Sequence, residues 1–500
     1  MWISVLISFA TIFSYVYVYL RRSWTFWKNR DVYTPPPRFP FGNVNDLIAG
    51  KLSFGEKMAQ LYFEFKKNEL RFGGFYFVQK PNLLLVDLDL IKLAMTKDFE
   101  HFTDRSAYVN EKKDLLSAHL FALQGEKWKN LRAKLTPTFT SGKMKTMFPI
   151  LVKCGRGLKD LIDGRVDGHP IDIKDAFARY TTDVIGSAAF GIECDSLKKP
   201  ESQFRKYGSK ITDTDFYGSV KRFLGFSAPK VLEFFNVKVL RKDVNDFFIN
   251  VVNETVNYRE ANDEKRNDFM QLLIEMKNDG KTLTIDEIAA QAFVFFQAGF
   301  ETSSTTLTFC CYELAQKIEV QERLRQEINA VLKRHGFVLT YESLKEMTYM
   351  DQCINETLRV YPPAPSITRK CTKTYKIPEV DVVIEKGTTI HIPIMGIQRD
   401  PDFYPNPLDF DPDRFSSELK NQRHPFSWFP FGEGPRVCIG MRFAIMQTKV
   451  ALVEVLRNFK VTLSDRTVAP ITLNPRGFLL NTKENVWMDV EKIKHQGENV

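Results

Sequence analysis

The sequence predicts one large domain that is mainly α-helical with small β-sheets, and two observations predict it. Apolar residues recur at helical spacing in long segments, whereas strand-like stretches are few and short. The helical segments are 55–70, 126–135, 143–163, 175–190, 240–260, 284–316, 317–334, 343–360 and 440–458. The strand-like stretches are 75–79, 83–86, 382–384 and 388–392. No internal repeat or Gly/Ser linker divides the 500 residues, so we expect a single core.

The first twenty residues differ from the rest in composition. The span from Trp2 to Leu20 carries no charge and is followed directly by Arg21 and Arg22. Such a span is just long enough to cross the hydrocarbon core of a membrane. A cleaved signal peptide and a buried core helix are the alternatives. The missing basic n-region and cleavage site favour an uncleaved anchor, and basic residues only after the span predict that the remainder stays cytosolic.

A proline cluster follows the basic residues. Pro35, Pro36 and Pro37 favour an extended, stiff segment that can space a globular body from the bilayer. A simple surface turn is the alternative. The expected organisation is therefore a membrane signal anchor at 1–20, a basic and proline-rich hinge at 21–42, and one large domain at 43–500.

Charge and cysteine content exclude several classes of protein. The net charge of +9 is modest for this length and forms no dense basic stripe, so we expect no nucleic-acid partner. The seven cysteines are an odd number without a C-x-x-C pair, and H-E-x-x-H is absent, which argues against a disulfide scaffold and a zinc site. We expect six of the cysteines to be inert and buried, and one to have a special role.

The special cysteine is Cys438, in the segment Phe-Gly-Glu-Gly-Pro-Arg-Val-Cys-Ile-Gly at 431–440. Gly432 and Gly434 permit positive φ and close approach of the chain to something flat. The apolar-periodic run that follows places Cys438 just ahead of a helix N-terminus, where the dipole and amides favour a thiolate. A buried cysteine in a glycine-rich turn is the alternative.

This segment resembles the cysteine signature of the cytochrome P-450 superfamily, F-x-x-G-x-R-x-C-x-G, at every fixed position. The resemblance implies the cytochrome P-450 fold, with haem b held between a long central helix and the helix after the cysteine loop. It implies Cys438 as the axial ligand of the haem iron, with Arg436 and Phe431 as further cofactor-binding residues. The anchor and hinge resemble the microsomal branch, and the run from Trp128 to Lys143 resembles the insect family-six xenobiotic-oxidising enzymes.

Four further residues resemble haem-contacting positions of the family. Trp128 and Arg132 are four residues apart and share one face of a predicted helix. The resemblance assigns this pair, together with Arg105 and Arg369, to the haem propionates. A packed tryptophan beside a solvated arginine is the alternative for the pair.

The segment from Ala298 to Ser303 interrupts the most apolar predicted helix, which begins at a capping box of Thr284 and Glu287. A glycine, an acid and hydroxyls in mid-helix are locally unfavourable, as is common at functional sites. The family resemblance implies an oxygen-binding groove, with Thr302 ordering water and Glu301 delivering protons to dioxygen. A back-bonded threonine and a solvent-reaching glutamate are the alternative.

Glu356 and Arg359 form an i, i+3 pair just before a proline-terminated helix end. The resemblance implies a buried structural ion pair completed by Arg414, from an irregular meander at 400–430. The family more often has glutamate at the position of Asp413, which leaves the local pairing of that residue open.

The resemblance implies a monooxygenase that inserts one atom of O₂ into lipophilic small molecules, such as xenobiotics, insecticides, plant toxins or endogenous hormones and lipids. The expected pocket lining is largely apolar, and core packing is the alternative for its phenylalanines. It comprises segment 106–121 and Phe293, Phe296, Ala298, Ala364, Ile367 and Phe478. No G-x-G-x-x-G follows a strand, so electrons must come from another protein.

By resemblance that protein is an NADPH-dependent flavoprotein reductase at the endoplasmic reticulum (microsomal) membrane, with cytochrome b5 as a second candidate. Basic residues near the cysteine side could steer an acidic donor, a solvated charged face being the alternative: Lys127, Lys129, Lys134, Arg442 and Lys449. Two other functions stay open, namely a haem-thiolate isomerase or dehydratase and a non-catalytic haem-binding protein.

Overall fold

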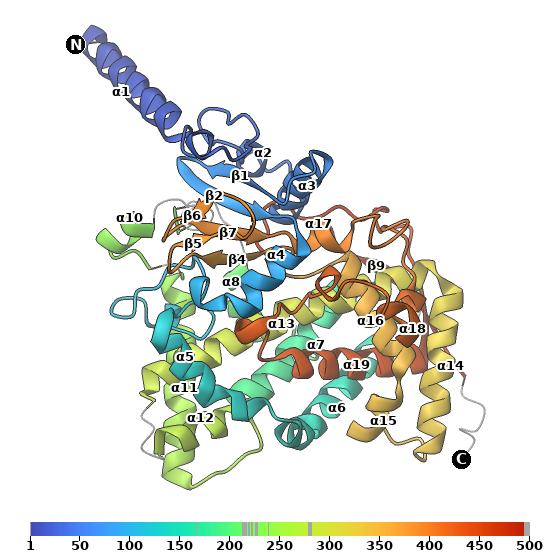
Figure 1. Ribbon diagram of the computed structural model, residues 1–500. Helices are drawn as coiled ribbons and strands as arrows, with labels where there is room; N and C mark the ends of the chain where they lie inside the picture. Colours follow the sequence, from blue (N-terminus) through green and yellow to red (C-terminus); the bar gives the residue numbers. More distant parts are fainter. Residues whose placement is uncertain are drawn as a thin grey trace.

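The computed structural model describes residues 2–494 except 167, 213–217, 219–220, 222–223, 226–228, 239 and 279–282. Helices make up most of it, as the sequence predicts (Figure 1). The longer ones are α1 (Trp2–Ser23), α3 (Phe54–Lys67), α5 (Gly125–Leu135), α6 (Ser141–Asp163), α7 (Ile173–Ile185), α8 (Gln203–Thr212), α11 (Lys242–Asn262), α12 (Phe269–Asn278), α13 (Ile285–Gln316), α14 (Ile318–Arg334), α16 (Thr348–Val360) and α19 (Met441–Asn458). The short ones are α2 (Asn45–Ile48), α4 (Leu88–Lys92), α10 (Pro229–Phe234), α15 (Tyr341–Glu346), α17 (Ile394–Gln398) and α18 (Ser417–Lys420).

Three small sheets accompany the helices. The largest has the strand order β1 (Phe72–Phe77), β2 (Lys80–Leu85), β7 (Thr389–Ile392) and β4 (Ile367–Lys370), with β2 and β7 parallel and the other pairs antiparallel. The second runs β3 (Ile171–Asp172), β9 (Trp487–Lys492) and β8 (Phe459–Leu463), and the third pairs β5 (Tyr375–Lys376) with β6 (Val383–Ile384). The large sheet therefore joins residues about 300 positions apart in sequence, such as Leu83 and Ile390.

Helix α13 is the centre of the main core. It begins at the predicted capping box, because the Thr284 side chain accepts from the Glu287 backbone N–H and the Glu287 carboxylate accepts from Thr284 N–H. Most of its 32 residues are buried, and α7, α11, α16 and α19 pack around it. A helix apolar on nearly all sides requires this kind of enclosure.

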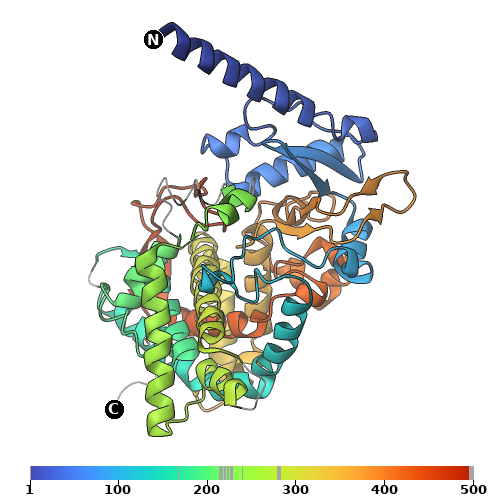
Figure 2. The same cartoon turned by 90° about the vertical axis from the view of Figure 1, so that its left-hand side faces the viewer.

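A second core lies between the large sheet, α3 and the segment after α1. It contains Trp27, Tyr62 and Phe75, all almost inaccessible to solvent. In Figure 2 the sheet lies on the side of the body from which α1 emerges, and the long helices lie on the other side. The two cores together make one body, consistent with the absence of a linker in the sequence.

The N-terminal helix α1 projects from this body (Figure 1). It is long and apolar enough to cross a membrane, and its side chains before Leu20 are exposed. The chain that follows packs on β1: Tyr33 O accepts from Gly74 N at 2.8 Å, and Trp24 Nε1 donates to Val78 O at 2.8 Å. Pro35, Pro36 and Pro37 lie outside helices and strands.

Helical periodicity located most of the long helices but missed α8, α12 and some boundaries. The segment 343–360 is two helices, α15 and α16, separated at Met347. The segment 175–190 ends as a wider helical turn from Gly186 to Phe190. Strands β8 and β9 were missed, since a five- or six-residue run beside a long helix is ambiguous from periodicity alone. The meander at 400–430 contains only short turns and α18.

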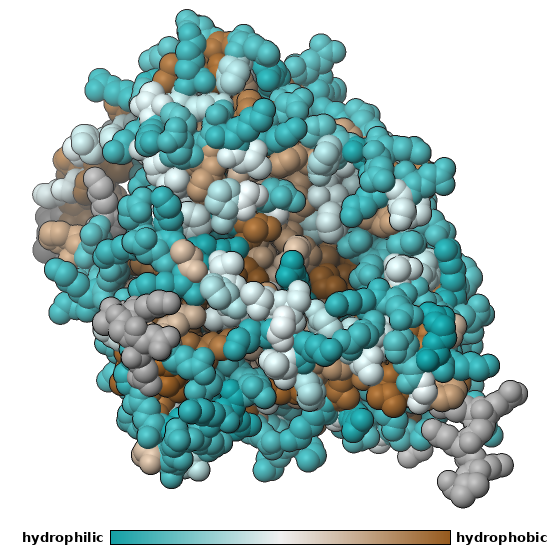
Figure 3. Space-filling model, turned by 60° about the horizontal axis from the view of Figure 1, so that its bottom comes forward, coloured by the Kyte–Doolittle hydropathy of each residue, from teal (hydrophilic) through white to brown (hydrophobic). Residues whose placement is uncertain are grey.

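The face shown in Figure 3, with the underside of the molecule turned forward, is covered mainly by hydrophilic side chains. Apolar side chains show there chiefly in recesses. The exposed apolar side chains of α1, such as Phe9 and Tyr15, lie at the other end of the body. The underside is therefore mainly polar, whereas the projecting helix α1 carries many exposed apolar side chains.

Candidate functional site

Cys438 lies three residues before α19 begins, as predicted. Its backbone N–H donates to Phe431 O at 2.9 Å and closes the loop. Gly432 and Gly434 have φ of +73° and +70°, which confirms the need for glycine. The close approach at Gly434 is to the chain itself, because a Cβ there would lie 1.9 Å from Met95 O. The expected approach to a flat ligand is therefore not the reason for this glycine.

Six of the seven cysteines are buried, as predicted, and Cys438 is exposed. Burial among protein atoms nevertheless raises the pKa of the Cys438 thiol, while the Gly440 N–H, Arg105 and Arg132 act to lower it. The helix start therefore contributes toward a thiolate, as expected, but desolvation outweighs it in the protein alone. A coordinated metal cation deprotonates such a thiol outright.

Arginines converge near this thiol. Arg436 is 3% exposed, stacks on Trp128 with its guanidinium carbon 3.9 Å from the ring centre, and donates to Thr103 O and Leu123 O at 2.9 Å. Arg105 donates weakly to Phe121 O and Arg436 O, both at 3.4 Å. The structure thus brings three of the predicted cofactor-binding residues, Trp128, Arg105 and Arg436, into one cluster, with Arg436 as the stacking partner of Trp128; their contact with a cofactor stays a prediction.

The arginine cluster carries more positive charge than the acid beside it, Asp104, can compensate. Desolvation and the mutual repulsion of the guanidinium groups lower the pKa of Arg436 to about 9, and desolvation and Arg132 lower that of Arg105 to about 10. Arg369 is 1% exposed, and among the described residues its Nε has no hydrogen-bond partner. Asp104 is the acid nearest to Arg436, at 3.9 Å. A buried cluster of this kind fits a dianionic ligand, and the two propionates of haem supply those charges.

The turn of α13 from Ala298 to Ser303 is the second part of the site. Ala298 is exposed in the middle of an otherwise buried helix, which shows that the helix borders open space here. The Thr302 hydroxyl donates to Ala298 O at 2.6 Å, so the threonine is back-bonded, as the alternative interpretation had it. Its oxygen lone pairs stay available to accept a further hydrogen bond.

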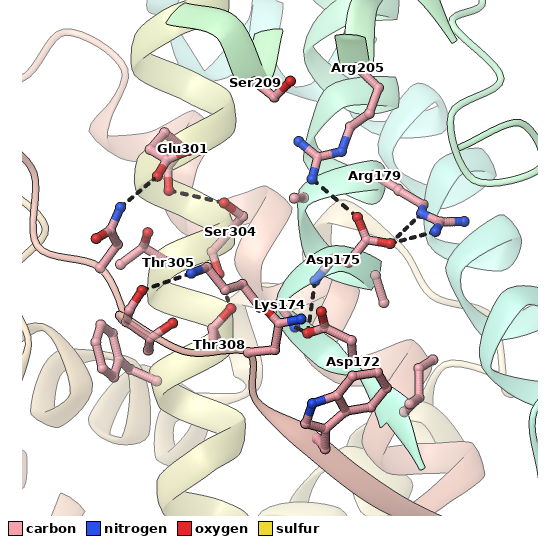
Figure 4. Close-up of a pocket in the computed structure, with 18 of the residues that line it drawn as sticks. Asp172, Lys174, Asp175, Arg179, Arg205, Ser209, Glu301, Ser304, Thr305 and Thr308 are labelled. Carbon is pink, nitrogen blue, oxygen red and sulfur yellow. Dashed lines mark hydrogen bonds and ion pairs between the residues drawn. The ribbon is translucent and has the colours of Figure 1, made fainter. Parts of the chain in front are cut away.

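Glu301 faces a polar pocket of about 680 Å³ between α7, α8, α13 and the loop at 474–487 (Figure 4). Its carboxylate accepts from Asn481 Nδ2 at 3.4 Å. Burial raises the pKa of Glu301, and Asn481, Lys174 and Arg205 act to lower it. Sequence reasoning missed these three neighbours, because they come from separate elements and form no motif.

The predicted structural ion pair is present and buried. Glu356 and Arg359 are both 0% exposed and joined by two hydrogen bonds of 2.7 and 2.8 Å. Arg414 Nε lies 3.5 Å from Glu356 Oε1, as predicted for the third member. Asp413 pairs instead with Arg323 of α14 at 2.8 Å, so the shorter acid has a partner of its own. Arg359 also donates to backbone carbonyls of Gln398 and Pro407, which ties α16 to the meander.

The expected lining residues divide into two groups. Ala298, Ala364 and Ile367 are not fully buried, and Ile367 Cδ1 lies within 3.3 Å of a Cβ built on Gly432 of the cysteine loop. Phe478 is 42% exposed and stacks on Phe54, with ring centres 6.1 Å apart.

The other group is Phe293 and Phe296, which are 2% and 0% exposed. Their rings pack against Phe248 of α11 at 5.2 Å, so they belong to the main core, as the alternative interpretation had it. Segment 106–121 reaches α13, because Leu120 N donates to Gln291 Oε1 at 2.9 Å.

The basic residues near the cysteine side are not equivalent. Lys127 and Lys129 are exposed and pair with Glu111 and Glu126, and Arg442 is exposed beside Ser141. Lys449 is 4% exposed and bound to Asp351 at 2.9 Å. The expectation that Lys449 belongs to a steering surface is therefore wrong, because its position on α19 faces inward.

Comparison with known proteins agrees with this geometry. Residues 34–488 match the family model "Cytochrome P450". Cytochrome P450 6a2 of Drosophila melanogaster is 42% identical over 98% of this chain and 99% of its own length. Probable cytochrome P450 6a13 of the same organism is 43% identical over 98% and 99%, and cytochrome P450 6A1 of Musca domestica is 40% identical over 95% of each chain.

The names of these relatives confirm the resemblance to insect family six. Neither the isomerase or dehydratase alternative nor the carrier alternative is favoured by them. Agreement of this extent, over nearly the whole of both chains, shows that the protein belongs to the cytochrome P450 family.

Proposed function

We propose that Cys438 is the axial thiolate ligand of haem b in a monooxygenase that inserts one atom of O₂ into lipophilic small molecules. The observation that carries this proposal is an accessible thiol at the start of α19, beside an arginine cluster that has Asp104 as its one nearby acid among the described residues. When bound, haem supplies the activation of dioxygen and the oxidation of the substrate. The protein supplies orientation, charge and protons.

The cofactor-binding residues are Cys438, Phe431, Trp128 and four arginines. Arg105, Arg132, Arg369 and Arg436 compensate the propionates, since each arginine donates several hydrogen bonds in a fixed plane. Trp128 holds the planar Arg436 guanidinium against its ring. Phe431 accepts the Cys438 N–H and so fixes the direction of the thiol. The Glu356–Arg359–Arg414 group is structural, because it is buried and joins α16 to the meander.

Glu301 and Thr302 of α13 transfer protons on the side of the site opposite Cys438. Burial raises the pKa of the Glu301 carboxyl, which favours its protonated, proton-donating form, and Glu301 borders a polar pocket from which water can resupply the proton. The Thr302 hydroxyl, anchored to Ala298 O, can accept a hydrogen bond from water in the groove. The pair therefore moves a proton from the pocket side of α13 to its cavity side.

The substrate class follows from the lining. Ala298, Ala364, Ile367 and Phe478 are small or apolar, and Phe293 and Phe296 support the wall from the core. Apolar pockets select lipophilic molecules of suitable size rather than one functional group. Xenobiotics, insecticides, plant toxins and endogenous hormones or lipids are all of this class.

Electrons come from a microsomal NADPH-dependent flavoprotein reductase, with cytochrome b5 as a second donor. Helix α1 anchors the enzyme in the endoplasmic reticulum membrane, and the basic residues after it keep the catalytic domain in the cytosol. The exposed side chains of Lys127, Lys129 and Arg442 lie on the cysteine side and attract an acidic donor.

The decisive test is the absorption spectrum of the reduced, carbon monoxide-bound protein in membranes. We expect the red-shifted Soret band of a thiolate-ligated haem, and its loss in Cys438→Ser with retention in the buried-thiol control Cys154→Ser. A wild-type Soret band without the red shift would exclude thiolate ligation. Thr302→Ala should keep the band and divert electrons from product to peroxide, and unchanged coupling would exclude its proton role.

A further inference from the structure

Gln447 is a buried amide that crosses from the cysteine helix to the oxygen-side helix. It lies on α19, nine residues after Cys438 (447 − 438), and is 0% exposed. Its Nε2 donates to Gly299 O at 3.1 Å and also to the Ser303 hydroxyl. The two acceptors lie on α13, four residues apart, on either side of Glu301 and Thr302.

The orientation of this amide is fixed by chemistry. A backbone carbonyl only accepts, so the nitrogen of the Gln447 side chain must face Gly299. Within the described part of the chain, Gln447 Oε1 has no hydrogen-bond partner. An apolar side chain of similar volume would avoid that unsatisfied oxygen. What an amide adds at this position is therefore its hydrogen bonds to α13.

The turn of α13 that Gln447 contacts is held from two directions. On the α7 side, a Cβ added at Gly299 would lie 2.5 Å from Ile185 Cδ1, so the helices are in close contact there. Tyr180 of α7 also donates to Gln447 O at 2.9 Å and fixes the backbone of α19 at the same level. Three helices are therefore locked together at the turn that carries Thr302.

The hydrogen bonds of this turn depart from those of a regular helix. Ala298 O accepts from the Thr302 hydroxyl at 2.6 Å, and Gly299 O accepts from Gln447. Two consecutive carbonyls thus have side-chain donors in addition to the helical ladder. Side-chain donors at such carbonyls bend or loosen a helix locally. The bond from Gln447 is the one that originates on the Cys438 helix.

We propose that Gln447 is a positioning residue that fixes the Glu301–Thr302 turn of α13 relative to the helix that carries Cys438. The inference rests on the proposed roles of Cys438, Glu301 and Thr302. It adds the residue that sets the distance between the Cys438 helix and the Glu301–Thr302 turn. Small displacements of positioned groups have large effects on reaction partitioning. Loss of the Gln447 amide should therefore leave the Cys438 ligand intact and shift the Glu301–Thr302 turn of α13.

The test uses full-length enzyme in membranes, supplied with flavoprotein reductase and NADPH, and the variants Gln447→Met and Gln447→Glu. Both keep the length of the side chain and remove the amide nitrogen. We expect a Soret band at the wild-type position, a shifted C–O stretching frequency of the carbon monoxide complex, and a peroxide-to-product ratio raised about fivefold, the effect of one hydrogen bond of typical strength.

Thr448→Val is the matched control, since it removes a buried hydrogen bond that stays within α19. It should match wild type in all three measurements. A wild-type C–O frequency and coupling in both Gln447 variants would overturn the proposal, as would loss of the Soret band in both, which would indicate a role in folding alone. Thr302→Ala separates the two proposals: if its coupling is unchanged, the proton role fails, while the C–O frequency still decides the role of Gln447.

Discussion

The cysteine side and the α13 side of the site are built differently. On the cysteine side, charged groups are buried and held by several fixed partners, as Arg436 and the Glu356–Arg359 pair illustrate. On the α13 side, Ala298 is exposed, and Glu301 borders a pocket of about 680 Å³ with one weak hydrogen bond of 3.4 Å. The charged groups of the cysteine side are therefore each fixed by several partners, whereas Ala298 and Glu301 on the α13 side have open space beside them.

This difference suits two tasks. A cofactor must be held in one geometry, which requires side chains whose own positions are locked by neighbours. Substrate and water must enter, turn and leave, which requires space and polar groups that can exchange partners. Substitutions on the cysteine side should therefore reduce stability and haem retention, whereas those on the α13 side should alter proton and substrate behaviour.

The largest effect is expected at Arg359. Replacement by alanine leaves the buried Glu356 carboxylate with the Asp411 backbone N–H at 2.9 Å and Arg414 at 3.5 Å, and should destabilise the fold by about 3–5 kcal/mol. Arg323→Ala breaks the half-exposed pair with Asp413 and should change stability by about 0–1 kcal/mol. Chemical denaturation of the haem-loaded enzyme measures both. Equal effects would contradict the view that burial makes the cysteine side rigid.

Arg436→Lys should follow in size. Lysine keeps the charge but loses the planar contact with Trp128 and the paired bonds to Thr103 O and Leu123 O, a loss of about 2–3 kcal/mol. Faster transfer of haem to an acceptor protein and a lower denaturation midpoint are the expected signs. Arg442→Lys is the control, since Arg442 is exposed and donates a hydrogen bond to the Ser141 hydroxyl at the surface. If the two variants behave alike, charge and not geometry retains the cofactor.

These two sides also differ in what sequence alone could predict. Cys438, Arg436 and the Glu356–Arg359 pair lie in short local motifs, so the start of α19 and the buried ion pair could be predicted from sequence, while the roles of Cys438 and Arg436 toward a cofactor stay predictions. Lys174, Arg205 and Asn481, which surround Glu301, come from three separate elements, so only tertiary structure brings them together. The interior position of Lys449 was missed for a related reason: a lysine on a helix is normally solvated, and its burial depends on α16.

A smaller effect is expected in the pH dependence of Glu301. Burial raises the pKa of this carboxyl above its ordinary value of 4.5, so the folded state holds a proton that the unfolded state releases. The stabilisation that this bound proton gives the folded state is complete below pH 4.5. It is lost as the pH rises through the raised pKa of the folded state. Glu301→Gln should flatten this part of the curve of denaturation midpoint against pH. The same change at exposed Glu254 of α11 should leave the curve unaltered, and a curve unaltered by Glu301→Gln would contradict the assignment.

The smallest effect on stability is expected at Phe478, the outermost of the proposed lining residues. Its ring is 42% exposed and stacks on Phe54, so Phe478→Ala should change the free energy of unfolding by no more than about 1 kcal/mol. Phe63→Ala on α3 is matched in exposure at 37% but lies away from the proposed lining. Spectral titration with large and small apolar ligands should show weaker binding of the large ones in Phe478→Ala only. Equal ligand affinities in the two variants would place Phe478 outside the substrate pocket. Ala298 would then be the outermost of the lining residues that remain.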